Sequence, residues 1–228
     1  MKKLVIIPTY NEKENIRDII SAIFSLEQDF HILVVDDSSP DGTAEIVKAM
    51  QSEFPHHLHL SIRKVKDGLG KAYIHGFWWA LQNNYDYIFE MDADFSHNPN
   101  DLPKLLEACQ KADMVIGSRY CKGVNVVNWP MSRVLLSYFA SKYVRLILGI
   151  PIHDTTAGFI CFSRKALENI GLDKIRLKGY GFQVEMKYRA FKKGLNLVEI
   201  PIIFTDRTLG ESKMNGGMTT NWARFGSP

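Results

Sequence analysis

Apolar, strand-like runs alternate with helix-like runs through the first half of this chain. The pattern predicts strands at 4–8, 30–35, 58–64, 87–91 and 114–117, and helices at 15–26, from 41 onward, at 70–83 and at 102–111. Such an alternation favours a mostly parallel central sheet with helices on both faces. We therefore expect an α/β, Rossmann-like fold, in which ligands bind at the carboxyl ends of the strands.

The second half of the chain is less regular. It predicts a helix with a broad apolar surface at 134–148, a strand at 155–163, a helix at 181–193 and a final strand at 195–205. No internal repeat and no linker-like segment divides the chain. With 228 residues, 46% of them hydrophobic, the sequence is long enough for one well-packed domain, which we expect to span 1–228.

An Asp-Ala-Asp sequence, Asp92 to Asp94, follows the predicted strand at 87–91. In an extended segment, residues two apart point the same way, so both carboxylates can reach one cation. Oxygen ligands suit Mg²⁺ or Mn²⁺, and such an ion neutralises the charge that grows on a departing diphosphate. The alternative is that Asp92 or Asp94 only caps the following helix. The short pattern is generic by itself.

A second acidic pair, Asp36 and Asp37, ends the strand at 30–35. A carboxylate there can accept hydrogen bonds from a base or a ribose. Asp41 is interpreted mainly as a turn residue and helix N-cap. Neither a GxGxxG nor a GxxxxGK[ST] sequence is present, which disfavours a dinucleotide enzyme and a P-loop NTPase.

Basic residues are concentrated in one segment, although the net charge is only +3. No acid occurs from Met114 to His153, and the segment carries several cations, which suggests an anionic partner. The helix at about 131–148 has two interpretations, an ordinary core helix or an interfacial helix with its apolar face in lipid; the acid-free surroundings favour the second. No run of about 20 apolar residues predicts a membrane span.

The cysteines and histidines predict no metal or disulfide site. The three cysteines are scattered and fit a reducing cytosol. The seven histidines show no metal-ligand spacing, and His56, His57 and His59 are interpreted as a surface turn.

Six motifs appear in order along residues 3–214. They are Pro8-Thr9-Tyr10-Asn11-Glu12, Asp36-Asp37-Ser38-Ser39-Pro40-Asp41-Gly42-Thr43, Asp92-Ala93-Asp94, Gly117-Ser118-Arg119, Thr156-Ala157-Gly158-Phe159, and Asp206-Arg207 followed by Gly210-Glu211-Ser212-Lys213. The ordered set resembles the dolichol-phosphate (polyprenol-phosphate) mannose synthases of glycosyltransferase family 2. The resemblance implies a GT-A fold and the inverting transfer of mannose from GDP-mannose to a polyprenyl or dolichyl monophosphate, with a divalent cation, Mg²⁺ or Mn²⁺.

The resemblance also implies roles for individual residues. Residues 1–118 would form the nucleotide-sugar-binding half and 119–228 the acceptor half. The guanosine would be held by Pro8, Tyr10, Glu12, Val35 and Asp37. The diphosphate would be held through the metal by Asp92, Ala93 and Asp94, with Asp94 as the main metal ligand. Arg119 would lie near the donor phosphates, Arg133 would receive the lipid phosphate, and Arg207 and Lys213 would close a loop over the site.

The acceptor chemistry needs no dedicated base. A phosphate monoester has a second pKa of about 6 and is already an oxyanion at neutral pH, so positioning and charge neutralisation are what it requires. The expected location is cytoplasmic and peripheral to a membrane, with a possible separate membrane-bound subunit and no nucleic acid partner. The alternatives are UDP-glucose or another donor, and a non-catalytic nucleotide-sugar-binding subunit. A sugar nucleotidyltransferase is disfavoured because the loop after the first strand is not glycine-rich.

Overall fold

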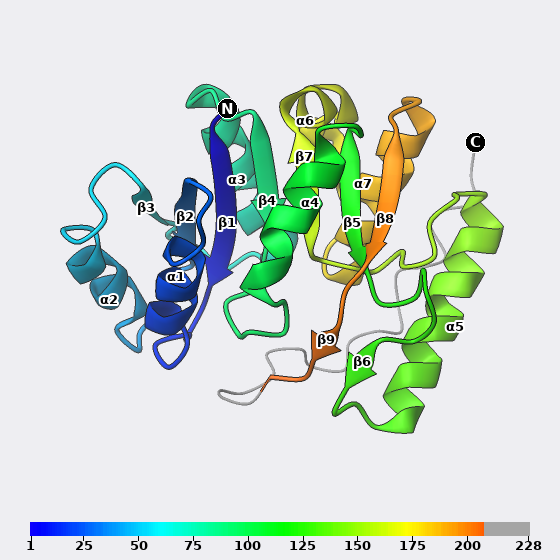
Figure 1. Ribbon diagram of the computed structural model, residues 1–228, viewed down its shortest axis with the longest axis horizontal. Coiled ribbons are helices and arrows are strands. Elements are labelled where there is room, and N and C mark those ends of the chain that lie inside the picture. The colour runs from blue at the N-terminus through cyan, green and yellow to red at the C-terminus, as the bar shows by residue number, and fades with distance from the viewer. Residues whose placement is uncertain (208–228) are drawn as a thin grey trace.

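A seven-stranded sheet forms the centre of the protein in the computed structural model, which describes residues 1–207 (Figure 1). The strand order is β3-β2-β1-β4-β7-β5-β8. The strands are β1 (Lys3–Thr9), β2 (Phe30–Asp36), β3 (Leu58–Ile62), β4 (Tyr87–Glu90), β5 (Met114–Ser118), β7 (Ile160–Ser163) and β8 (Leu197–Pro201). Strand β7 runs antiparallel to β4 and β5, and the other neighbouring pairs are parallel, so the predicted mostly parallel sheet is confirmed.

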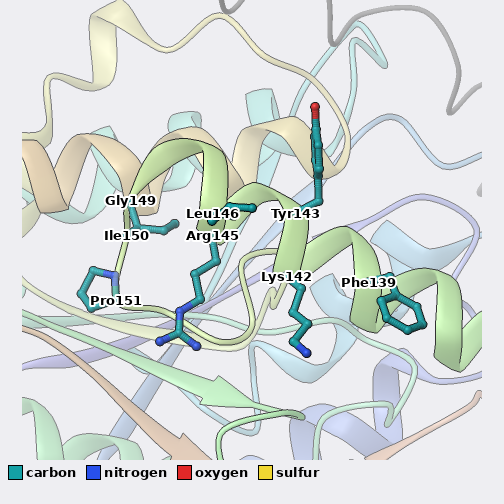
Figure 2. A pocket seen from close by; sticks show the side chains of 8 residues that line it. All are labelled: Phe139, Lys142, Tyr143, Arg145, Leu146, Gly149, Ile150 and Pro151. Carbon is teal, nitrogen blue, oxygen red and sulfur yellow. The ribbon is translucent and has the colours of Figure 1, made fainter.

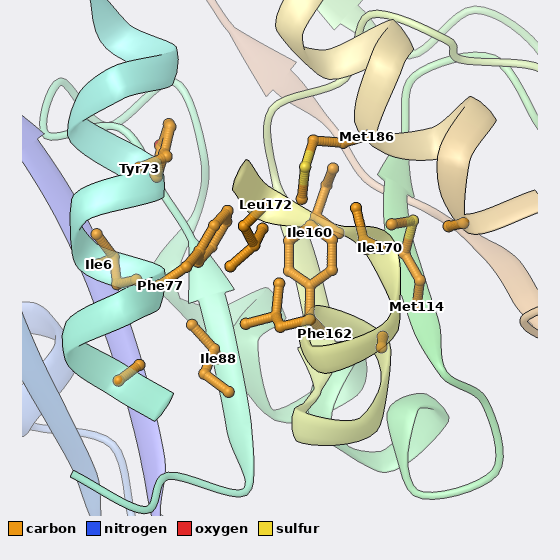
Figure 3. Close-up of a cluster of buried hydrophobic side chains, with 14 of the residues drawn as sticks. Ile6, Tyr73, Phe77, Ile88, Met114, Ile160, Phe162, Ile170, Leu172 and Met186 are labelled. Carbon is orange, nitrogen blue, oxygen red and sulfur yellow. The ribbon is translucent and has the colours of Figure 1, made fainter. Parts of the chain in front are cut away.

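Helices cover both faces of the sheet (Figure 1). One face packs against α1 (Ile16–Phe24), α2 (Thr43–Met50) and α4 (Leu102–Cys109), and the other against α3 (Leu69–Gln82), α6 (Arg164–Ile170) and α7 (Tyr180–Lys192). Figure 3 shows part of the second core, where Phe77, Phe162 and Met186 meet beside the sheet. Short 3₁₀ helices occupy Pro99–Asp101 and Leu172–Lys174.

Strand β1 shows why the sequence builds two cores. Leu4 and Ile6 belong to one apolar cluster and Val5 and Ile7 to the other, and all four are fully buried. Successive side chains of a strand point to opposite faces, so a continuous apolar run is expected only where both faces are covered. The strand therefore lies in the middle of the layers.

The order of strands reverses between β1 and β4. From β1 the chain continues outward to β2 and β3, and then returns to place β4 on the other side of β1. In open α/β sheets, ligands bind at such a switch point, beyond the carboxyl ends of the strands. That edge is the lower one in Figure 1, where β1 and β2 end.

Two predicted strands in the second half have wrong boundaries, and one helix there was not predicted. The strand expected at 155–163 begins only at Ile160, because the residues before it turn inward to bind Arg119. The strand expected at 195–205 divides into β8 and β9 (Phe204–Thr205), and β9 pairs with β6 (Val126–Val127) in a separate two-stranded sheet. Helix α6 was not predicted; the Ser163 hydroxyl caps it by accepting from the Ala166 N–H at 3.2 Å.

Helix α5 (Met131–Leu148) lies beside the sheet rather than on it (Figure 1). It follows Pro130 and ends at Gly149, whose φ of 63° is the left-handed conformation that glycine adopts at a helix C-terminus. Only Ser141 and Val144 of this helix are buried. Within residues 1–207, no helix combines the length and hydropathy needed to cross a bilayer.

Candidate functional site

Three loops meet the carboxyl edge of the sheet, after β1, β2 and β4. Each loop contains a non-glycine residue with a left-handed backbone: Asn11 (φ 55°), Ser38 (φ 55°) and Phe95 (φ 60°). Asparagine tolerates this conformation, but for Ser38 and Phe95 it is unfavourable, and it persists where the surroundings enforce it. Two of the loops that carry predicted site residues therefore contain a strained backbone position.

The Asp92–Asp94 segment follows β4 directly. The Asp94 Oδ1 atom accepts a hydrogen bond from the Ser96 N–H at 3.1 Å, and its Oδ2 atom lies 2.8 Å from Arg207 Nη2. The Asp92 Oδ1 atom accepts a weaker bond from the Tyr73 hydroxyl at 3.4 Å. Both carboxylates therefore have hydrogen-bond partners, and Arg207, which was predicted for the site, contacts Asp94.

The electrostatics of this acidic segment fit a cation. Removal from water, and then the charge of Asp94, raise the pKa of Asp92 to about 7, although Arg207 opposes the shift. Two carboxylates confined together are costly unless positive charge compensates them. Their hard oxygen atoms match the ligands that Mg²⁺ and Mn²⁺ take in proteins. Asp92 and Asp94 are thus the residues that could hold a divalent cation at this edge.

The two acids after β2 have different partners. Asp36 is a structural residue, because its carboxylate accepts from the Thr9 hydroxyl at 2.8 Å and from the N–H and hydroxyl of Ser39 at 2.8 and 2.6 Å. Asp37 has one oxygen 3.3 Å from Arg63 Nε. Burial raises the pKa of Asp37, and Arg63 partly offsets that shift. Asp37 remains the acid placed to accept a hydrogen bond from a ligand.

The other residues predicted to hold a nucleoside line the same edge. The Tyr10 ring has Lys66 Nζ 3.5 Å from its centroid, and Glu12 accepts from Asn15 Nδ2 at 3.1 Å. Pro8 lies in β1, paired with Val35 of β2. Since the Val35 side chain is fully buried in the core, any contact from Val35 would come from its main chain.

Gly42 rather than Asp41 is the N-cap of α2, whereas the interpretation of Asp41 as a turn residue agrees with its contacts. Its Oδ1 atom accepts from the N–H and hydroxyl of Thr43, at 3.0 and 2.6 Å, and its Oδ2 atom accepts from the Lys13 N–H at 3.1 Å. Asp41 thereby fixes the start of α2 and ties the loop after β1 to the loop after β2.

Arg119 follows β5 and is buried against an acid that the sequence did not single out. Its Nε and Nη2 atoms donate to the two oxygens of Asp154 at 2.7 and 2.6 Å, and Nη2 also donates to the Thr156 hydroxyl at 2.9 Å. A bidentate, buried pair of this kind is both strong and directional. Most of the guanidinium is therefore engaged by the protein itself, and a contact with donor phosphates stays a prediction.

A signal for Asp154 was present in the sequence. The acid-free segment runs from Met114 to His153, and Asp154 is the first acid after it. The Arg119 charge, together with hydrogen bonds from Arg119, lowers the pKa of Asp154 despite its burial. Asp154, the first acid after the acid-free segment, is thus the buried counter-charge of Arg119, which lies within that segment.

Arg133, in α5, and Arg207, which follows β9, are linked because Arg133 pairs with the residue next to Arg207. Arg133 Nη1 lies 3.0 and 3.1 Å from the two oxygens of Asp206, and its guanidinium lies 4.0 Å from the centre of the Trp129 ring. The next residue, Arg207, contacts Asp94. The dipeptide 206–207 therefore connects the start of α5 to the acidic segment. Lys213, also predicted for the site, lies outside the described residues.

A buried polar network of Glu90, Gln183 and Lys187 lies next to the acidic segment, because Glu90 is the last residue of β4. Glu90 and Lys187 are both fully buried. Glu90 Oε2 accepts from Gln183 Nε2 at 2.6 Å, and Lys187 Nζ donates to the Ala157 carbonyl at 2.7 Å. Burial raises the pKa of Glu90 to about 8 and lowers that of Lys187 to about 8. The sequence signal was the four-residue spacing of Gln183 and Lys187 on α7, which places two polar side chains on one helix face.

Glu185, to which the sequence assigned no role, has a structural one. Its Oε2 atom accepts from the N–H groups of Arg176 and Leu177 at 3.0 and 2.9 Å, and its Oε1 atom accepts from Arg189 Nε at 2.8 Å. Glu185 therefore fixes the loop that precedes α7.

His97 gives the site a predictable response to acid. It accepts a hydrogen bond from the Asp92 N–H at 3.3 Å through Nδ1 and stacks on Phe159 with ring centroids 4.8 Å apart. Burial lowers the pKa of His97 to about 4 from its ordinary value of 6.5. Between these values the unfolded chain binds more protons at His97, so the free energy of unfolding falls as the pH decreases from 6.5 to 4, by on the order of 3 kcal/mol. Urea titrations at a series of pH values give the free energy of unfolding of the wild type and of His97→Gln. This free energy should change less steeply with pH in the variant. Equal pH dependence in both proteins would contradict the assignment.

Comparison with known proteins identifies the family of the chain. Residues 4–171 match the family model described as glycosyl transferase family 2. The chain is 48% identical over 96% of its length to an undecaprenyl-phosphate mannosyltransferase from Micrococcus luteus, covering 89% of that protein. It is 47% identical over 94% of its length to a polyprenol monophosphomannose synthase from Mycolicibacterium smegmatis, covering 82% of that protein.

A solved structure shows the same fold at low sequence identity. Glucosyl-3-phosphoglycerate synthase from Mycobacterium tuberculosis, in complex with Mn²⁺, UDP and phosphoglyceric acid, aligns with a TM-score of 0.61 and 21% identity, covering 88% of this chain and 68% of that one. The predicted GT-A type of fold is confirmed. With the family model and both curated relatives spanning most of its length, the chain belongs to glycosyltransferase family 2 and is a glycosyltransferase.

Proposed function

We propose that this protein transfers mannose from GDP-mannose to a polyprenyl monophosphate at the cytoplasmic face of a membrane, with inversion at the sugar carbon. The names of the two curated relatives support the sugar and the acceptor class. The observation that carries the proposal is the chain of contacts from Arg133 through Asp206 and Arg207 to Asp94. These contacts support the proposal because they link Arg133, whose guanidinium suits a phosphate, to an acidic segment that suits a metal-bound diphosphate.

The reaction requires one bond to form while another breaks. An oxygen of the acceptor phosphate attacks the anomeric carbon from the face opposite the diphosphate, and the bond to the diphosphate breaks, releasing GDP. The acceptor oxygen is already ionised at neutral pH, so no proton has to be removed first. Asp92 and Asp94 would hold a divalent cation, which supplies positive charge against the departing diphosphate.

Arg133 has the role of binding the acceptor phosphate. Its side chain is 43% exposed and stacked on Trp129, and exchanging Asp206 for a phosphate would keep two charge-assisted hydrogen bonds. We expect Arg133→Ala to raise the KM for polyprenyl phosphate about tenfold, equivalent to about 1.4 kcal/mol, and to leave the KM for the nucleotide sugar nearly unchanged. Steady-state kinetics with each substrate varied in turn measures this difference.

Arg145→Ala is the matched control for Arg133→Ala. It removes the same charge from the last turn of the same helix. If both variants raise the acceptor KM equally, α5 acts only through its general positive charge, and the assigned role of Arg133 is wrong. An equal rise in both substrate constants for Arg133→Ala would also contradict it.

Helix α5 is the surface that we propose to contact the membrane. It exposes Met131, Leu135, Leu136, Phe139, Tyr143, Leu146 and Ile147, each at least 47% accessible. The polar residues Ser137 and Ser141 lie on its protein side, where Ser137 accepts from the Tyr120 hydroxyl at 2.8 Å and Ser141 is buried. A soluble helix normally shows the reverse arrangement. An apolar face turned outward suits the boundary between lipid headgroups and acyl chains.

Basic side chains flank this apolar face. A surface hollow at the end of α5 is lined by Phe139, Lys142, Tyr143, Arg145 and Leu146, among others, and Figure 2 shows Lys142 and Arg145 extending to the same side of the helix. Cations near an anionic leaflet contribute about 1 kcal/mol each. The helix thus combines apolar insertion with attraction to negative headgroups.

Leu146→Glu tests this orientation. Leu146 is 81% exposed, so the change costs little folding stability, but it places a negative charge on the proposed lipid face. We expect at least a tenfold weaker partition onto vesicles of anionic phospholipid, measured by sedimentation. Val65→Glu, at another apolar position that is 66% exposed, should bind vesicles like the wild type. Equal losses in both variants would exclude α5 as the specific contact.

The reaction itself is tested with labelled GDP-mannose and a short polyprenyl phosphate, with Mg²⁺ or Mn²⁺ and with EDTA. Organic-extractable label that disappears with EDTA would support donor, acceptor class and metal together. Activity with UDP-glucose instead would keep the chemistry and change the donor. Silence with every donor, while nucleotide still binds, would favour a binding-only subunit or a requirement for a separate membrane-bound subunit.

A further inference from the structure

Asp29, His31 and His57 lie together at the edge of the sheet opposite the acidic segment. One ligand atom from each of the three side chains lies within 4.8 Å of the other two. His31 is near the start of β2, whereas Asp37 follows its end, which at about 3.3 Å per residue separates this cluster from the glycosyltransferase site by roughly 20 Å. The cluster is therefore independent of Asp92 and Asp94.

The pairing of β2 with β3 creates this cluster. Ile32 pairs with Leu58, and the Ile32 N–H donates to the His57 carbonyl at 2.8 Å. His31 and His57, which precede these two residues, therefore become neighbours with ring centroids 4.5 Å apart. In the sequence they are 26 positions apart, which is why no metal-ligand spacing was evident there.

The hydrogen bonds of His57 leave an unusual arrangement. Its Nδ1 atom lies 3.0 Å from the Pro55 carbonyl oxygen, which can only accept, so Nδ1 carries a hydrogen. Its Nε2 atom lies 3.1 Å from Asp29 Oδ1. In a neutral ring that Nε2 atom presents a lone pair, and a lone pair facing a carboxylate is repulsive. A cation shared by Nε2 and the carboxylate removes the repulsion, as does a second proton on the ring.

In His31, as in His57, the Nδ1 atom is engaged by a hydrogen-bond partner within the protein. Its Nδ1 atom lies 2.9 Å from the Tyr85 hydroxyl, which leaves Nε2 as the nitrogen for a metal. Histidines that bind metals usually use one ring nitrogen for the metal and hydrogen-bond the other to a carbonyl, a carboxylate or water, which fixes the ring. His57 follows this pattern through Pro55, and Tyr85 fixes His31.

We propose that Asp29, His31 and His57 form a second cation site, selective for a late first-row divalent metal such as Zn²⁺. Two imidazole nitrogens and one carboxylate oxygen suit Zn²⁺ with water as the fourth ligand, whereas Mg²⁺ prefers oxygen ligands alone. The 4.8 Å span of the ligand atoms requires only side-chain rotation to contract around an ion, because Asp29 is 71% and His57 43% exposed. The site clamps the turn before β2 to the turn before β3, and so stabilises the fold by mass action.

The test uses the full chain after EDTA treatment and desalting, with ZnCl₂ as the probe. Equilibrium dialysis with elemental analysis gives the number of Zn²⁺ ions bound and their affinity, and thermal unfolding gives the shift in Tm. Measurements are made in the Asp94→Asn background, so that a failure of the glycosyltransferase assignment cannot be mistaken for a failure here. Asp29→Asn and His57→Ala remove ligands; His75→Ala, at an exposed histidine bonded to Ser61, is the control.

We expect the background protein to bind one Zn²⁺ and to rise in Tm, with His75→Ala unchanged. Asp29→Asn and His57→Ala should each weaken the affinity at least tenfold and lose the Tm shift. Because Asp29 is exposed, its replacement keeps the test valid even if His57→Ala fails to fold. Zn²⁺ binding that is equal in Asp29→Asn and in the control, or absent from the background protein, would overturn the proposal.

Discussion

Asp94→Asn should reduce mannose transfer by at least about a thousandfold, equivalent to about 4 kcal/mol of transition-state stabilisation. The substitution keeps the shape of the side chain but removes the charge that faces Arg207 at 2.8 Å and that we propose binds the cation. Neutralising one of two metal carboxylates weakens both metal binding and the neutralisation of the departing diphosphate. The initial rate at saturating Mn²⁺ and substrates measures the loss.

Asp101→Asn is the matched control for Asp94→Asn. Asp101 is also a buried acid beyond β4, but its carboxylate pairs with Lys104 at 2.6 Å rather than with site residues. We expect it to keep nearly full activity. Equal unfolding midpoints for the two variants would show that the loss at Asp94 is chemical. Near-normal turnover by Asp94→Asn would exclude Asp94 as a metal ligand.

Asp154→Ala should lower the free energy of unfolding by about 3–5 kcal/mol. Arg119 is only 6% exposed and has both of its forked contacts on Asp154, so the substitution leaves a buried guanidinium without its counter-charge. It also frees the Arg119 N–H, which donates to Asp154 Oδ2 at 2.9 Å. Urea unfolding followed by circular dichroism measures the change.

Two further variants separate the causes of the loss at Asp154. Glu168→Ala breaks a partly exposed ion pair with Arg164 and should cost about 1 kcal/mol or less. The double change Arg119→Met with Asp154→Leu should recover part of the stability, because the uncompensated charge is gone. A loss below about 1 kcal/mol for Asp154→Ala would show that water reaches Arg119 in the folded protein.

The local features of the site were predictable because they depend on neighbours in the sequence. The three loops after β1, β2 and β4 follow mainly apolar strands, and their acids lie close together in the chain. Parallel strands bring such loops to one edge regardless of the details of packing. The role of Asp41 in the turn was likewise predictable, because its carboxylate bonds a residue only two positions away.

The partners of buried charges were not predictable in the same way. Arg119 pairs with Asp154 at a separation of 35 residues, and Glu90 pairs with Gln183 at a separation of 93. Such long-range pairs depend on which strands become neighbours. The order of strands is not evident from the sequence, because β7 lies between two strands that precede it in the chain. The same limitation applies to β6 and β9, since strands of two residues carry too little pattern to detect.

The antiparallel strand β7 explains why Asp154 was missed among the candidate residues, and why Thr156, although part of a recognised motif, was given no role. A parallel strand delivers the residues that follow it to the ligand edge, but β7 runs the other way, so it delivers the residues that precede it. The loop before β7 therefore reaches the site from the start of a strand and needs no helix to bring it there. In this fold, a search for functional side chains should examine the residues that precede the antiparallel strand and the residues that follow each parallel strand.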